Sequence, residues 1–157
     1  MRCAVIGALL FASGVSMAIS QELSPAKLAS IHIRVVRTET LQPVAKFKVS
    51  VASFHSPETM RHQVTLRTDS SGAAAVPLSL FGGTPPERLA VNVAYGNWTQ
   101  CSPRVFVWDE IVLSGVVAAN KCESNSKGTS QIHADPGELV VFIKHISPRE
   151  KLRHFPG

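Results

Sequence analysis

Side chains suited to acid–base or metal chemistry are spread along this chain of 157 residues rather than gathered in motifs. Asp109 and Glu110 are adjacent, so on a strand they would point to opposite faces and could not cooperate as an acid and a base. No two histidines have the i, i+4 spacing that places two ligands on one face of a helix. We therefore predict no catalytic residue, no metal ligand and no cofactor. The six histidines are His32, His55, His62, His133, His145 and His154.

Two other kinds of chemistry lack their sequence motif. Ser114 precedes Gly115, but the Gly-x-Ser-x-Gly pattern of a nucleophile elbow does not surround it. Gly82-Gly83 leads into Thr84-Pro85-Pro86 with no lysine, which excludes a phosphate-binding loop. The favoured interpretation is a noncatalytic interaction or structural module. A small envelope hydrolase that uses a histidine and a carboxylate is the alternative.

Aromatic side chains suggest a second alternative, a carbohydrate-binding module. Trp98 and Trp108, together with Tyr95 and Phe106, could form a platform on which a sugar ring stacks. Aromatic residues make up only 6% of the chain, and such side chains more often fill the core of a sandwich. We favour the core for these residues and keep Trp98 and Trp108 as possible stacking residues.

The first twenty residues predict export. Met1-Arg2 supplies a positive start, the run from Ala4 to Ala12 is apolar, and Ser16-Met17-Ala18 has the small-x-small spacing of a cleavage site. The apolar run is shorter than the stretch of about 20 residues that spans a membrane. We expect a signal peptide over residues 1–20, cleaved after Ala18 or Ser20. The mature protein would be secreted or periplasmic, with no transmembrane segment.

The two cysteines of the mature chain, Cys101 and Cys122, form the one covalent link that the sequence predicts, because Cys3 leaves with the signal. An even pair in an oxidising compartment is most simply a disulfide. A redox pair or a zinc site would need Cys-x-x-Cys spacing or a nearby histidine cluster, and the sequence has neither.

Charge indicates the kind of partner. The net charge is +5, and it becomes +4 when Arg2 is removed with the signal. The favoured interpretation of this charge is an ordinary solvated basic surface. Where there is a partner, this balance in an exported protein points to an envelope protein or to an anionic polysaccharide or lipid surface, and not to nucleic acid. We predict that any contact with an anionic surface involves the cations near the C-terminal end, which are Lys144, Arg149, Lys151 and Arg153.

Short β-branched runs separated by turn residues predict an all-β fold. Asp69-Ser70-Ser71-Gly72 and Asp135-Pro136-Gly137 are the clearest turns. We expect a prealbumin-like or immunoglobulin-like β-sandwich of about seven or more strands in residues 21–146. A basic tail follows over 147–157, where the capping box Ser147-Pro148-Arg149-Glu150 predicts a short helical turn. The expected strands lie in residues 31–35, 46–51, 64–68, 73–80, 89–95, 105–107, 111–119 and 139–146.

Residues 31–100 resemble a known family of sandwiches. Pro43 to Val51, then Thr68 to Ala74, then the alternating Leu89 to Tyr95 are similar to the carboxypeptidase regulatory-like domains. That family consists of transthyretin-like seven-stranded sandwiches found beside peptidases, in outer-membrane receptors and in secreted bacterial proteins. Its usual glycine near position 46 is Lys46 in this chain.

The same fold hosts an enzyme family, the transthyretin-related hydroxyisourate hydrolases. Those enzymes use a histidine in an early strand, an arginine, another histidine and a C-terminal Tyr-Arg-Gly-Ser. This chain has His32 and Arg34 in its first expected strand, but its last residues are His154-Phe155-Pro156-Gly157. The resemblance to the enzymes is therefore incomplete.

Overall fold

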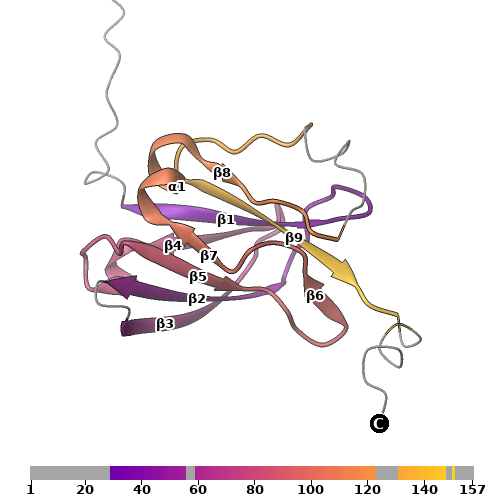
Figure 1. Ribbon diagram of the computed structural model, residues 1–157, viewed down its shortest axis with the longest axis horizontal. Coiled ribbons are helices and arrows are strands. Elements are labelled where there is room, and N and C mark those ends of the chain that lie inside the picture. Colours follow the sequence, from indigo (N-terminus) through magenta and orange to yellow (C-terminus); the bar gives the residue numbers. More distant parts are fainter. Residues whose placement is uncertain (1–28, 56–58, 123–130, 148–149, 151–157) are drawn as a thin grey trace, which may run out of the picture.

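Two β-sheets packed face to face form the protein in the computed structural model, which describes residues 29–55, 59–122, 131–147 and 150 (Figure 1). The first sheet has the strand order β4-β1-β9-β6, and β8 also pairs with β9. The second has the order β3-β2-β5-β7, so the prediction of an all-β sandwich is confirmed. The strands of the first sheet are β1 (Ser30–Arg37), β4 (Ala73–Pro77), β6 (Trp98–Gln100), β8 (Val116–Val117) and β9 (Glu138–His145). Those of the second are β2 (Lys48–His55), β3 (Thr59–Arg67), β5 (Arg88–Asn92) and β7 (Val105–Val107).

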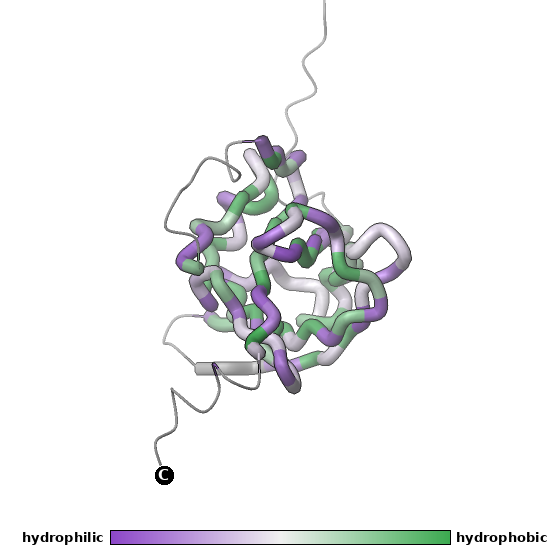
Figure 2. Tube along the Cα trace, turned by 90° about the vertical axis from the view of Figure 1, so that its right-hand side faces the viewer, coloured by the Kyte–Doolittle hydropathy of each residue, from purple (hydrophilic) through white to green (hydrophobic). Residues whose placement is uncertain are grey.

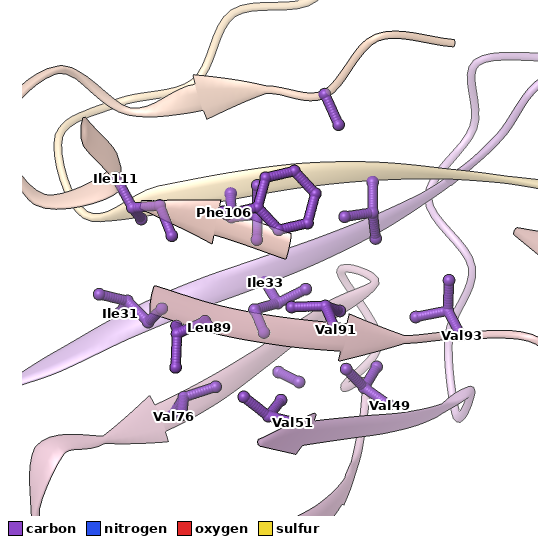
Figure 3. Packing of buried hydrophobic residues seen from close by; sticks show 14 of the residues in the cluster. Ile31, Ile33, Val49, Val51, Val76, Leu89, Val91, Val93, Phe106 and Ile111 are labelled. Atoms are coloured by element: carbon purple, nitrogen blue, oxygen red, sulfur yellow. The ribbon is translucent and has the colours of Figure 1, made fainter. Parts of the chain in front are cut away.

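The period-two pattern of the sequence builds the core between the sheets. Hydrophobic and hydrophilic positions alternate along much of the chain (Figure 2), because successive residues of a strand point to opposite faces. Ile33 of β1 and Val51 of β2 are completely buried, whereas His32 is exposed. Figure 3 shows Ile33, Val51 and Val91 pointing into the space between the sheets. Each fully buried aliphatic side chain of this kind stabilises the fold by about 1.5–3 kcal/mol.

The strand β9 is buried on both of its faces. It pairs in parallel with β1, and its residues Leu139, Val141 and Ile143 belong to the core between the sheets. Val140 and Phe142 point the other way, into a second cluster that is covered by Leu41, by Val117 of β8 and by Ile132 and Ala134, which precede β9. Burial on both faces explains the unbroken apolar run from 139 to 143, which is typical of parallel strands.

A pair of cysteines ties the segment that follows β8 to the first sheet. The sulfur atoms of Cys101 and Cys122 are at bonding distance, and their Cα atoms are 5.2 Å apart, within the range of disulfides. Cys101 is buried in the second cluster and directly follows β6. The structure therefore brings together the two residues that the sequence predicts to be bonded.

One predicted strand is wrong. The run 111–119 contains the end of the helix α1 (Trp108–Ser114) and only the two-residue strand β8. Trp108, Ile111 and Val112 are the buried side of the helix, at i, i+3 and i+4. Asp109 and Glu110 lie in its first turn, where carboxylates interact favourably with the helix dipole, and not on a strand. A short apolar run fits both the 3.6-residue period of a helix and the two-residue period of a strand, so the sequence did not distinguish a helix from a strand here.

Some strand bounds also differ from the prediction. β4 ends at Pro77 and a 3₁₀ turn, Leu78–Phe81, follows it, while β5 ends at Asn92. The strand β6 was not predicted. The expected capping box forms, since Ser147 N–H donates to Glu150 Oε2 (3.0 Å) and Glu150 N–H donates to Ser147 Oγ (3.3 Å). The rest of the tail and the predicted signal peptide lie outside the described residues. In the described part, no helix combines the length and apolar character of a membrane span.

The predicted turn before β4 is held by one carboxylate. Asp69 Oδ1 accepts hydrogen bonds from the backbone N–H of Ser71 (2.8 Å) and of Ala73 (3.1 Å), and from the Ser71 hydroxyl (2.6 Å). Gly72 has φ +77°, and a Cβ there would lie 2.5 Å from the Cβ of Pro43. These hydrogen bonds, with the Ser71 hydroxyl first, lower the pKa of Asp69 below its usual value of 3.8.

We expect Asp69→Asn to reduce the acid sensitivity of the fold. A carboxyl whose pKa is lower in the folded state stabilises that state above the unfolded-state pKa, and the contribution disappears as pH falls through the folded-state pKa. The amide of the variant keeps an acceptor oxygen but does not titrate. The measurement is urea unfolding from neutral pH to below 3.8. A constant difference between the two proteins over this range would contradict the assignment. Asp69→Ala, which also removes the acceptor, should be less stable at every pH.

Replacing both cysteines by alanine should lower the free energy of unfolding by roughly 3 kcal/mol, because a cross-link between residues 21 positions apart restricts the unfolded chain. Urea unfolding of the double variant and of the oxidised protein measures the difference. Thiol titration of the denatured, unreduced mature protein should find no free thiol. Two reactive thiols in that titration would contradict the predicted bond.

Candidate functional site

On two neighbouring strands, β1 and β9, the row of side chains that faces the core ends in a basic residue. Residues two apart on a strand share a face, so Arg37 continues the inward series of Ile33 and Val35 on β1. In the same way His145 continues the series of Ile143 on β9. Both strands finish at the same end of the sandwich, on the right in Figure 1 and toward the viewer in Figure 2. Polar groups thus occupy positions that the core pattern would fill with aliphatic side chains.

An open groove of about 400 Å³ lies at this end of the molecule. We call it the end groove and define it by the five residues that line it, Arg37, Glu39, Thr40, Trp98 and His145. Its volume is at the low end of the range for small-molecule sites, which is about 300–1,000 Å³. It contains a guanidinium, a carboxylate, a hydroxyl and an imidazole around one indole ring.

The indole of Trp98 is fixed by contacts with three side chains. Trp98 on β6 is the cross-strand partner of His145, and the two ring centroids are 5.0 Å apart with an interplanar angle of 79°. Phe47, just before β2, approaches edge-on at 5.9 Å. The Cζ atom of Arg37 lies over the ring, 5.2 Å from its centroid. Trp98 is half-buried and packs against the main core, so the groove rests on the folded sandwich.

Among the described residues, the Arg37 guanidinium contacts the Trp98 ring and forms no ion pair with a carboxylate. Its side chain forms no hydrogen bond or ion pair within the described residues, and its Nε is buried without an acceptor. Glu39 lines the same groove and likewise forms no ion pair with described residues. A cation over an indole face is stabilised by about 0.5–2 kcal/mol. The Nη groups of the guanidinium therefore have no partner among the described residues and can donate to a ligand.

The two tryptophans proposed for sugar stacking are not brought together. Trp108 is only 1% exposed and belongs to the main core, so the stacking hypothesis is wrong for this residue. Trp98 alone reaches a groove. Tyr95, the third aromatic residue considered with them, bonds through its hydroxyl to Ser50.

The predicted cationic tail is only partly described. Lys144 forms an ion pair with Glu150, with Nζ and Oε1 3.0 Å apart. The pKa of Glu150 is lowered, first by the backbone N–H of Ser147 and then by Lys144. Lys144 thus has an internal partner. Arg149, Lys151 and Arg153 lie outside the described residues, so the surface that they would form with Lys144 stays a prediction.

The residues that suggested a hydrolase have separate surroundings. His32 is exposed on β1. Arg34 is engaged in a structural link, because its Nε lies 2.8 Å from Glu138 Oε1 and its Nη2 donates to the carbonyl of His133 at 2.6 Å. Among the described residues, no group of three or more His, Cys, Asp or Glu side chains is placed to hold a metal ion.

A second, smaller groove of about 230 Å³ lies on the outer face of the second sheet. Ala52 and Ala90 are cross-strand partners in it, and Gln63, Asn92 and Arg104 also line it. It contains no histidine and no carboxylate, so it offers less varied chemistry than the end groove.

Sequence reasoning did not identify Arg37, Glu39, Thr40 and His145 as one site. The available signal was the basic residue at the end of each apolar alternation, Arg37 after Val35 and His145 after Ile143. Their proximity depends on the parallel pairing of β1 with β9, which joins segments about a hundred residues apart in the chain. The chain itself matches no known family model, no curated protein and no solved structure.

The two tryptophans should respond differently to truncation. Trp108→Ala should lower the free energy of unfolding by about 3–5 kcal/mol, as expected for a large buried aromatic side chain, and Trp98→Ala should cost less than about 2 kcal/mol. Urea unfolding measures both values. Acrylamide quenching of Trp98→Phe and Trp108→Phe checks exposure, and only the variant that retains Trp98 should be strongly quenched. Equal quenching would contradict the assignment of Trp98 to the groove.

Proposed function

We propose that this protein is a secreted or periplasmic, noncatalytic interaction module that binds its ligand in the end groove. The observation that carries the proposal is the half-buried Trp98 with Arg37 stacked over it and His145 against it. Sites of this composition, one aromatic wall with a few fixed polar groups, are typical of small-ligand recognition. The predicted export signal over residues 1–20 and the basic balance of the chain agree with a partner on an envelope surface.

We also propose a prealbumin-like sandwich of the carboxypeptidase regulatory-like type. Two observations support it. In the immunoglobulin order the first strand shares a sheet with the second, fourth and fifth strands, whereas here β1 pairs with β4 and β9 while β2 pairs with β3 and β5. Lys46, where that family usually has glycine, has φ +57°, the left-handed conformation that glycine favours.

A hydrolase remains the second candidate because His145 and Glu39 line the same groove. An imidazole and a carboxylate are the groups that general acid–base catalysis requires. No hydrogen bond joins these two side chains in the described part of the chain, and His145 instead contacts the Trp98 ring. This arrangement favours binding over proton transfer.

Calorimetric titration of the mature protein with a panel of neutral and acidic envelope oligosaccharides and peptides tests the proposal. We expect saturable binding of at least one compound without product formation, weakened at least about tenfold by Trp98→Ala, since aromatic residues dominate such contacts. Trp108→Phe, which changes the core and not the groove, is the matched control and should bind normally. Hydrolysis that His145→Asn removes would favour the enzyme instead. Binding that is insensitive to both Trp98→Ala and His145→Asn would exclude the end groove.

A further inference from the structure

We infer that the end groove recognises the carboxylate and hydroxyls of a hexuronate, the sugar acid of anionic polysaccharides. This inference depends on the proposed function, and it names the ligand class of the same groove. Three features of the described residues carry it: Arg37 has no ion-pair partner among them, Glu39 and Thr40 line the same groove, and the Trp98 ring forms part of its wall.

Arg37 supplies the contact for a carboxylate. Its guanidinium lies over the Trp98 ring at 5.2 Å and is bound to no carboxylate of the described chain. This contact engages none of the Nη–H groups in a hydrogen bond, so the planar fork of the two Nη groups remains for a ligand, whereas the Nε–H is buried. That planar fork matches the two oxygens of a carboxylate. The cross-strand partner of Trp98, His145, adds a second N–H donor at the wall of the groove.

Glu39 and Thr40 indicate that the anion also carries hydroxyl groups. The Glu39 carboxylate has acceptor oxygens only, so it repels the acceptor oxygens of a simple anion such as phosphate. It accepts hydrogen bonds from hydroxyls, and the Thr40 hydroxyl can donate to or accept from them. A ligand with one carboxylate and several hydroxyls satisfies Arg37 and Glu39 at once, and a sugar acid has this combination.

The indole and the size of the groove fit a sugar ring. Trp98 is half-buried, so part of its apolar surface lines the groove and can pack against the C–H groups of a pyranose. A volume of about 400 Å³ is at the low end for small ligands, which suits one or two sugar residues. The net positive charge of the chain raises the local concentration of a polyanion at its surface.

Calorimetric titration with trigalacturonate and triglucuronate, each beside its methyl ester, tests the inference on the mature protein. Esterification removes the charge and keeps the hydroxyls and the ring. We expect at least one free acid to bind at least about tenfold more tightly than its ester, because a hydrogen bond to a charged group contributes more than one to a neutral group. Arg37→Gln should remove this preference and Arg37→Lys should retain part of it. Arg104→Gln makes the same change of charge at the second groove and should leave both affinities unchanged.

Thermal unfolding and near-ultraviolet circular dichroism of each variant establish that the fold and the Trp98 environment persist. Equal binding of an acid and its ester would overturn the inference and leave the binding module in place. Failure of both uronates to bind at millimolar concentration would also overturn it, while the wider ligand panel decides the proposed function separately. If folded Arg37→Gln still prefers the free acid over its ester to the same degree, Arg37 does not bind the carboxylate. Inorganic phosphate binding as tightly as a uronate would reduce the groove to a simple anion site.

Discussion

The parallel pairing of β1 with β9 is the contact on which the other parts of this structure depend. It joins the first and last described strands, from His32 opposite Glu138 to Arg37 opposite Ile143. β1 then carries β4 on its other side, and β9 carries β6 and β8, so the whole first sheet is built on this pair. Parallel strands need a long connection between them. Here that connection includes the entire second sheet, which makes the sandwich a consequence of the pairing.

The same pairing explains why the segment after β8 is needed. β9 presents Val140 and Phe142 on the face away from the main core, and exposed side chains of this size would leave an apolar patch on the sheet. Residues such as Val117 and Ile132 cover that face, and the cysteine pair ties the covering segment to the residue that follows β6. Gly115 permits the turn from α1 into β8, because a Cβ there would lie 2.4 Å from the Asp135 carbonyl oxygen.

The end groove lies where β1 and β9 continue beyond the packed core of the sandwich. Arg37 and His145 have inward-facing positions, yet the sheets at this end leave an open groove in place of an apolar core. Trp98 belongs to both regions, since it packs against the core and also lines the groove. Glu39 and Thr40 are exposed in the turn after β1, and the folded core fixes the position of the Trp98 ring. Prior fixation of this kind lowers the entropy that a ligand must overcome on binding.

The sequence by itself determined the sandwich class, the Asp69 turn and the strand over residues 31–35, because alternation and turn chemistry are local properties. Parity of cysteines paired Cys101 with Cys122 once Cys3 was assigned to the predicted signal peptide. The sequence did not determine that residues 108–114 are helical, since a short apolar run fits both periods. It also did not reveal the end groove. Arg37, Trp98 and His145 come from three strands, and only the long-range registers of β1 with β9 and β9 with β6 place them together.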